Sequence, residues 1–357
     1  MVAATDQPVP SKEPEFSFEA LKAQVEAHLG GVGLPRKGSW PMLLKVGVLL
    51  VAWGLVYAGL LTFGPRSLVV AVGGTVLLAG TTLTIQLAVM HDASHRGLSG
   101  RAWLNRLASW TLTCVGASSI VWYHKHVRSH HGHTNEPGRD PDLDAEPLFR
   151  FCPQQPWRPW HRWQHLYAIP LYSLLALRWV WLDDLLDALR NTYGLRGRAY
   201  AWLLVEVAVC RVLHLGAFLV LPYLVVGRVG PVVGLYLLHW LLMGLAMPIV
   251  FQPAHVTGVQ AFPAESDRPK DWALRQVTTT TDFGVRHRLL TWFLGGLNFQ
   301  VEHHIFPTTC HQHYPAIQPI VKRYCRDHGV VYHEYPSFLA ALRAHFAHLR
   351  NLGRRPA

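Results

Sequence analysis

The sequence predicts an all-α integral membrane protein, with four transmembrane helices in two hairpins and a helical cap that is rich in histidine. Four long apolar runs, and three histidine clusters placed beside their ends, support this fold class. The chain has 357 residues, of which 50% are hydrophobic and 15% are charged. This composition is too apolar for an ordinary soluble domain and too charged for a bundle that lies wholly in lipid.

Each apolar run is long enough to cross a membrane, because a hydrocarbon core of ~30 Å needs roughly 20 helical residues. The turns Gly64–Ser67 and Val226–Gly230 join the runs in pairs, so we expect two hairpins. In this arrangement Lys45 and His91 should lie on the same side of the membrane. The predicted spans cover residues 42–63, 68–90, 200–226 and 229–251.

The distribution of basic residues predicts the orientation of the chain. The two outer turns contain only Arg66 and Arg228, whereas nearly all other Lys and Arg residues fall on the opposite side. Since basic residues favour the cytoplasmic face, we expect both termini and all three histidine clusters there. The net charge of +11 then fits a surface near anionic lipid, and not a nucleic-acid-binding protein, because the charges flank apolar spans.

The sequence predicts three units along the chain. Residues 1–35 hold a polar tail and a short amphipathic helix from Ser17 to Leu29. Residues 36–335 form the membrane domain, and residues 336–357 form a C-terminal helix and tail. The five cysteines have no metal-binding spacing, so we expect reduced thiols.

Two segments of the membrane domain have mixed polarity, and polar residues also occur inside the spans. We expect residues 103–122 and 166–182 to lie at the membrane surface as shallow helices. Polar groups inside a membrane need partners, so we expect Glu206 to pair with Arg211 or His214.

Three histidine clusters lie at the predicted cytoplasmic ends of the spans. In the first, His91 and His95 are four residues apart and would share one helix face at about 6 Å. The second and third contain adjacent pairs, which diverge by about 100° on a helix and can therefore reach two different ions. Neutral imidazole is a common protein ligand of iron, zinc and copper, so the clusters predict a metal centre.

With His255, which follows the last span, the clusters supply eight imidazoles. Eight ligands are too many for one metal and suit two, whereas a zinc site is normally a compact set of four. Gln300, one turn before His303, is either a further donor or a group that supports a ligand. We therefore expect a two-iron centre formed by His91, His95, His126, His130, His131, His255, His303 and His304.

These clusters resemble the histidine boxes of the membrane fatty acid desaturases, which are di-iron enzymes. The first box, Met90-His-Asp-Ala-Ser-His95, is similar to the HxxxH pattern, and the box from His126 to His131 is similar to HxxHH with one extra residue. The third, Gly295-Gly-Leu-Asn-Phe-Gln-Val-Glu-His-His, resembles the GGLNxQxxHH stretch of front-end desaturases. The resemblance covers roughly residues 35–335 and implies a cytosolic cap over four spans. It also suggests that His124, Asn135 and Asn298 support the ligands.

The resemblance implies an oxygen-dependent fatty acyl desaturase that inserts a cis double bond. Gln300 favours a front-end, Δ6-type position on an unsaturated C18 chain, which CoA or a glycerolipid would carry. An apolar tunnel from the cap towards the spans should hold the chain, and the sequence does not identify the residues that line it. The His-Pro-Gly-Gly haem motif of a fused cytochrome b5 domain is absent from the sequence, so we expect electrons from a ferredoxin or a free cytochrome b5.

Two kinds of alternative remain open at this point. A desaturase of other regiospecificity, a di-iron hydroxylase or a sphingolipid-modifying relative would share the boxes, although usually not the Gly295-Gly-Leu-Asn-Phe-Gln300 stretch. A histidine-rich metal transporter would need metal-binding groups that face one another inside the spans, whereas the boxes lie outside them.

Overall fold

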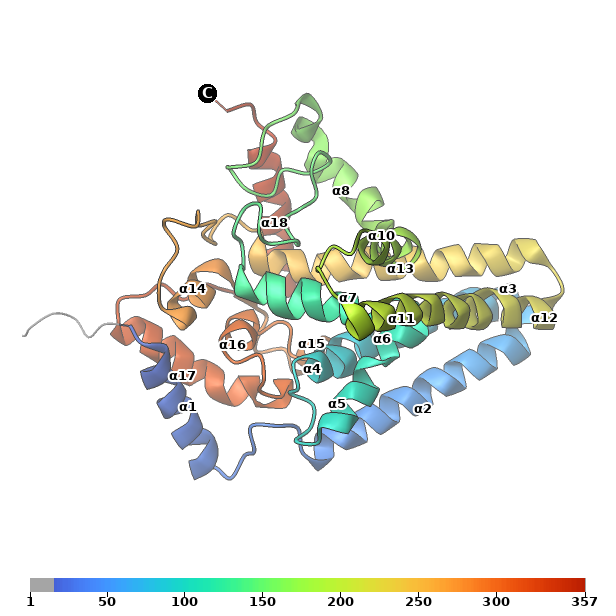
Figure 1. Ribbon diagram of the computed structural model, residues 1–357, viewed down its shortest axis with the longest axis horizontal. Coiled ribbons are helices and arrows are strands. Elements are labelled where there is room, and N and C mark those ends of the chain that lie inside the picture. Colours follow the sequence, from blue (N-terminus) through green and yellow to red (C-terminus); the bar gives the residue numbers. More distant parts are fainter. Residues whose placement is uncertain (1–15, 357) are drawn as a thin grey trace, which may run out of the picture.

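The computed structural model describes residues 16–356, so the polar tail expected over residues 1–15 lies outside the described part. Among the described residues, four helices are long and apolar enough to span a membrane. They lie along one another as a bundle, and the cap is at one end of this bundle (Figure 1). Each predicted span lies within one of these helices. The observed helices cover Trp40–Arg66, Leu68–Ser94, Gly197–Val226 and Val229–His255.

The first box follows directly from a spanning helix. Ser67 caps the start of helix α3, since its side chain accepts a hydrogen bond from the backbone N–H of Val70. The helix continues through the π-helical turn η2 into α4. The second hairpin contains a similar π-helical turn, η6. The elements are α2 (Trp40–Phe63), η1 (Gly64–Arg66), α3 (Leu68–Ile85), η2 (Gln86–Met90), α4 (His91–Ser94), α11 (Gly197–Leu215), η6 (Gly216–Val220), α12 (Leu221–Val226) and α13 (Val229–His255).

The segment between the first hairpin and the second box is not one shallow helix but three short ones. They break at Trp110 and at Gly116, which has a φ of +105°. A Cβ at Gly116 would lie 2.7 Å from the ring of His214, so glycine is required for this close approach. The elements are α5 (Ala102–Ser109), α6 (Thr111–Val115), α7 (Ser119–Trp122) and the π-helix η3 (Tyr123–His130).

The segment expected at the membrane surface over residues 166–182 is helical, with a break after Ser173. It packs on α13, because Gly244 has no side chain and leaves room for the backbone of Ser173. A Cβ added at Gly244 would lie 2.2 Å from the Ser173 carbonyl oxygen. The elements are η4 (Pro159–Trp163), α8 (Gln164–Ser173), α9 (Leu175–Arg178), η5 (Trp179–Asp183) and α10 (Asp184–Arg190).

Both ends of the described chain pack into the cap. The amphipathic helix expected near residue 17 is confirmed as α1, which buries Leu21, Val25 and Leu29 in an apolar cluster shared with α14, α16 and α17. The C-terminal helix α18 packs on α8 and α13. The cap elements are α1 (Phe18–Gly31), α14 (Trp272–Thr279), β1 (Asp282–Phe283), α15 (Arg288–Phe293), α16 (Gln300–Ile305), η7 (His311–His313), α17 (Tyr314–Asp327), β2 (Glu334–Tyr335, parallel to β1) and α18 (Phe338–Leu352).

The polar groups of α11 find partners other than those expected. The Glu206 carboxylate accepts hydrogen bonds from the backbone N–H and the hydroxyl of Ser119, at 2.6 and 2.7 Å. Arg211 donates to the carbonyl of Gly116 at 2.8 Å, and His214 donates to a neighbouring carbonyl. The expected pairing of Glu206 with Arg211 or His214 is therefore wrong, because the broken backbone around Gly116 supplies nearer partners.

Candidate metal centre

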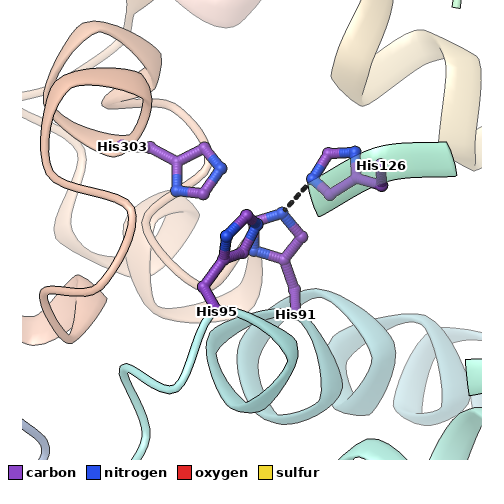
Figure 2. Close-up of side chains that lie close together, drawn as sticks. All are labelled: His91, His95, His126 and His303. Atoms are coloured by element: carbon purple, nitrogen blue, oxygen red, sulfur yellow. Dashed lines mark hydrogen bonds between the residues drawn. The ribbon is translucent and has the colours of Figure 1, made fainter. Parts of the chain in front are cut away.

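Four segments that are far apart in the sequence bring their histidines to one place in the cap. His91 and His95 come from the end of the first hairpin, His126 and His130 from η3, His131 from the position directly after η3, His255 from the end of α13, and His303 and His304 from α16. All eight side chains are buried, with at most 7% of any residue exposed. Figure 2 shows the rings of His91, His95, His126 and His303 pointing towards a common centre.

These four residues form the first group, in which one ring nitrogen of each residue lies within 4.8 Å of those of the others. The Nε2 atoms of His91 and His126 are 2.9 Å apart. The ring centres of His91 and His95 are 4.9 Å apart, and those of His91 and His303 are 4.5 Å apart. The i, i+4 spacing of the first box thus brings both rings to one position, as predicted.

His130, His255 and His304 form a second group, in which one ring nitrogen of each residue lies within 4.8 Å of those of the other two. Their ring centres are 4.8 to 5.0 Å apart. His131 lies between the two groups, with its ring 4.5 Å from that of His95 and 4.2 Å from that of His304. The adjacent pairs therefore reach both groups, which is the arrangement that two neighbouring metals require.

The chemistry of this cluster fits metal ions. Buried ring nitrogens without a hydrogen-bond partner are costly in a protein interior, and ligation would satisfy them. Burial, with the neighbouring histidines, holds the pKa values of His95, His126, His131, His303 and His304 well below the usual range, so these rings are neutral as ligands must be. In residues 16–356, the unpartnered nitrogens of the cluster are His91 Nδ1, His95 Nε2, His131 Nδ1, His255 Nδ1 and His304 Nε2.

A buried carboxylate orients His130. Its Nδ1 lies 3.0 Å from Asp140 Oδ1, and the other carboxylate oxygen accepts the backbone N–H of Asn135 at 2.8 Å. Burial alone would lower the pKa of His130, but the charges of Asp140 and Asp142 raise it to about 9. Nδ1 of His130 carries the proton that it shares with Asp140, so a metal would bind at Nε2. Binding there would displace the proton that Nε2 carries in the charged ring.

The third box is oriented by side chains from other helices. Gln276 on α14 accepts a hydrogen bond from His304 Nδ1 at 3.1 Å, and the same amide oxygen accepts the hydroxyl of Thr134 at 3.0 Å. The Nδ1 atom of His303 lies 3.1 Å from the hydroxyl of Tyr314. Gln276 and Tyr314 were not predicted from the sequence, because neither belongs to a histidine box and no local pattern connects them to one.

Of the three residues expected to support the ligands, only Asn135 contacts their backbone. Its side-chain amide donates to the carbonyl of His255 at 2.9 Å. His124 instead stacks on Tyr193, with ring centres 4.9 Å apart. Asn298 donates to Thr291 at 3.1 Å, so neither His124 nor Asn298 forms a hydrogen bond to a ligand candidate.

Gln300 is buried at the start of α16, with 1% of its surface exposed. Its Nε2 has no hydrogen-bond partner among the residues that the structure describes. Gly295, at the start of the same motif, has a φ of +60°, and a Cβ there would lie 2.4 Å from the carbonyl of Leu87. Glycine therefore lets the loop that precedes the third box lie against η2, the turn that precedes the first.

The sequence model of the fatty acid desaturase family matches residues 65–336 of this chain. The chain belongs to the fatty acid desaturase family. The resemblance of the boxes is thereby confirmed, and the protein is a membrane-bound desaturase of fatty acyl chains.

Curated relatives extend over nearly all of the desaturase. It is 34% identical to an acyl-lipid (8-3)-desaturase of Physcomitrium patens over 357 residues, which are 96% of this chain and 72% of the relative. It is 30% identical to the sn-1 linoleoyl-lipid 6-desaturase of Arthrospira platensis, covering 100% of this chain and 97% of the relative. The identity to the enzyme of the same name from Synechocystis sp. is 30%, with 94% of each chain covered.

A narrow apolar cavity lies between α3, α6, η5 and α13 of the desaturase, and His91 lines it. Trp122 also lines this cavity and stacks on the ligand candidate His126, with ring centres 4.3 Å apart and planes at 23°. Deeper in the membrane, Trp240 and Met243 of α13 contribute to the wall. This cavity runs from His91 at the cap towards the spans, which is where an apolar tunnel for the acyl chain was expected.

A third group of possible ligands in the desaturase, Asp92, Cys310 and His311, differs from the other two. His311 Nδ1 donates to Asp92 at 2.7 Å, and the Lys45 ammonium lies 3.0 Å from the other ring nitrogen. A bound cation would be repelled by this ammonium, so we interpret the group as an ion network that ties α2 and η7 to the first box. It also confirms that Lys45 lies on the same side as His91.

Proposed function

We propose that this desaturase uses two irons and O2 to insert a cis double bond at a front-end, Δ6-type position of an unsaturated C18 acyl chain. The observation that carries the proposal is the pair of histidine groups beside an apolar cavity between spanning helices. The two cyanobacterial relatives that match along nearly their whole length are named linoleoyl-lipid 6-desaturases, and these names support the Δ6 position.

Each group of histidines would hold one iron. His91, His95, His126 and His303 would bind the first, His130, His255 and His304 the second, and His131 would complete either. Imidazole-rich sites suit iron, and a structural zinc site would be a single closed set of four ligands. When bound, the irons would supply the redox chemistry for the reaction. O2 would be reduced to two waters by two hydrogens from a CH2–CH2 pair together with two external electrons and two protons.

The side chains of the protein orient the ligands and the substrate. Asp140 and Gln276 accept hydrogen bonds from Nδ1 of His130 and His304, so that Nε2 of each ring can bind metal, and the Tyr314 hydroxyl holds the ring of His303 through its Nδ1. The acyl chain would lie in the cavity with the reacting carbons next to His91. Its apolar wall would exclude water from the reaction, which protects the oxidant from side reactions.

The orientation and the electron donor belong to the same proposal. We infer that the cap and both termini face the cytoplasm, because the basic residues lie on that side. A separate ferredoxin or cytochrome b5 would deliver electrons there. Lys125 and Arg128, which flank His126 on η3, are at least partly exposed and would attract an acidic carrier.

The proposal is tested by expressing the full chain in a host that lacks Δ6 products and feeding linoleate. The position of any new double bond is then found by mass spectrometry of derivatised fatty acids, against cells without the chain. A new double bond at position 6 is the expected result. A hydroxylated product would support the hydroxylase alternative, and membrane-inserted protein without any product would contradict the proposal.

A further inference from the structure

Two indole rings form a continuous stack with one of the ligand candidates. Trp122, at the end of α7, stacks on His126 with ring centres 4.3 Å apart and planes at 23°. Trp179, at the start of η5, stacks on Trp122 with ring centres 5.6 Å apart and planes at 27°. Rings in such close contact can pass single electrons from one to the next. The stack therefore connects the first histidine group to an indole outside it.

The nitrogens of the two indoles have different hydrogen-bond partners. Trp122 Nε1 donates to the hydroxyl of Ser94 at 3.1 Å, whereas Trp179 Nε1 donates to Asp184 Oδ1 at 2.7 Å. Asp184 is fully buried, and its other oxygen accepts the backbone N–H of Ser118. An indole that has lost an electron is a strong acid at its nitrogen, so a carboxylate at this distance can take the proton. Oxidation would therefore come to rest on Trp179.

Asp184 can also return that proton. Burial raises the pKa of the Asp184 carboxyl to about 7, against the hydrogen bonds that it accepts and the charges of Arg211 and Lys125. Near neutral pH such a group takes up and releases a proton with little cost in either direction. A Trp179 radical formed by loss of an electron and a proton could thus be restored in place.

The position of the stack indicates when it would be oxidised. Both indoles line the apolar cavity proposed for the acyl chain, and His91 lines it too. With the chain in place, the nearest oxidisable group at the reaction point is its CH2–CH2 pair. With the cavity empty, it is the indole of Trp122. Because tryptophan yields an electron only to a strong oxidant, the stack suits removal of such an oxidant and not delivery of electrons from a mild carrier.

We infer that Trp122 and Trp179 protect the desaturase by reducing an O2-derived oxidant that forms while the cavity holds no acyl chain, an inference that rests on the proposed function. Trp122 gives an electron to the oxidant and takes one from Trp179, whose indole proton passes to Asp184. The external electron carrier then reduces the Trp179 radical, and the proton returns. Two such cycles replace the two electrons that the CH2–CH2 pair would supply, and protons from solvent complete the two waters.

The first test looks for the radical in the purified, iron-loaded, full-length enzyme in detergent. The enzyme is reduced without air, excess reductant is removed, O2 is added without an acyl substrate, and samples are frozen. Wild type should give the electron paramagnetic resonance signal of a neutral indole radical. Prior incubation with the linoleoyl substrate that the enzyme converts should suppress this signal, and Trp179→Phe should remove it. An active wild-type enzyme without the signal would overturn the inference.

The second test measures oxidative damage during repeated reduction and exposure to O2 without substrate. Trp122→Phe and Trp179→Phe keep an aromatic ring and remove the oxidisable indole. Each should lose its own initial linoleate conversion severalfold faster than wild type, and mass spectrometry of peptides should show more oxidation of His126. Oxidation of side chains near the oxidant is the damage expected when no other group supplies electrons.

Trp240→Phe is the matched control. Trp240 is buried and lines the same cavity, but its ring contacts within residues 16–356, with His214, Phe218, Tyr236 and His239, include no ligand candidate. This variant should lose activity at the wild-type rate. Equal rates of loss in all three variants would overturn the inference. A wild-type enzyme that desaturates no chain would instead overturn the proposed function.

Discussion

Asp140 accepts a hydrogen bond from Nδ1 of His130 at 3.0 Å, and both side chains are buried inside the cap. This contact connects the second histidine box to a loop ten residues further along the chain. It fixes the tautomer of His130 and thereby directs Nε2 to the metal group. A carboxylate behind a metal-binding histidine also raises the basicity of the ligand.

Replacing Asp140 with Asn should therefore weaken metal binding and activity by about 10- to 100-fold, the typical loss when such a supporting group is removed. The measurement is the iron retained after treatment with a chelator, together with linoleate conversion. Asp144→Asn is the control, because Asp144 is exposed. Equal iron retention in wild type and Asp140→Asn would show that this hydrogen bond does not support the metal.

Gln300→Val should reduce linoleate conversion by an order of magnitude or more, because the buried amide would no longer reach a ligand or an oxygen species. Gln300→His should retain part of the activity, since imidazole can also donate to iron. Both variants are compared at equal amounts of membrane-inserted protein. Unchanged product with Val at this position would leave Gln300 without a role in the reaction.

A cysteine introduced in the outer turn of the first hairpin and one introduced near the C-terminus should be labelled from opposite sides of the membrane. We would replace the exposed Cys114 with Ser and introduce Arg66→Cys in the outer turn or Arg355→Cys near the C-terminus. An impermeant maleimide applied to intact cells should react at position 66 and not at position 355. Reaction at 355 before lysis would contradict the proposed orientation.

The stability of the cap should decrease as the pH falls from about 6.5 towards 4. Burial lowers the pKa of His345 on α18 from 6.5 to about 4, although the hydrogen bond to the Val256 carbonyl opposes this shift. The other ring nitrogen lies 2.9 Å from the Tyr172 hydroxyl. Over this interval the unfolded chain binds a proton that the folded chain does not, so the free energy of unfolding falls with pH by up to about 3 kcal/mol for this group.

Thermal unfolding of the purified protein in detergent at several pH values measures this effect. His345→Gln, which keeps a polar side chain but cannot be charged, should unfold with a smaller dependence on pH. The same substitution at the exposed His28 serves as the control. An identical pH dependence in wild type and His345→Gln would argue against the buried neutral state of His345.

The sequence predicted the features that depend on local pattern. The four spans follow from the length of apolar runs, and the amphipathic α1 follows from the spacing of Leu21, Val25 and Leu29. The i, i+4 pair His91 and His95 likewise predicted one shared position.

The contacts that orient the ligands could not be predicted in this way. Gln276 lies 28 residues before His304, and the order of helices in space, not their sequence, brings the two together. The π-helical turns η2 and η3 shift side chains by an amount that a regular helix does not predict. Glu206 was assigned the wrong partners because the sequence does not reveal that the helix at residues 103–122 breaks at Gly116.

The iron content of the purified chain tests the two-metal centre most directly. Elemental analysis of the wild type and of His304→Ala should be made on samples that elute as folded protein in detergent, with His28→Ala as the matched control. We expect two irons per chain in wild type and control, and loss of iron and of linoleate conversion in His304→Ala. Zinc in place of iron, a single metal per wild-type chain, or full activity in His304→Ala would contradict this expectation.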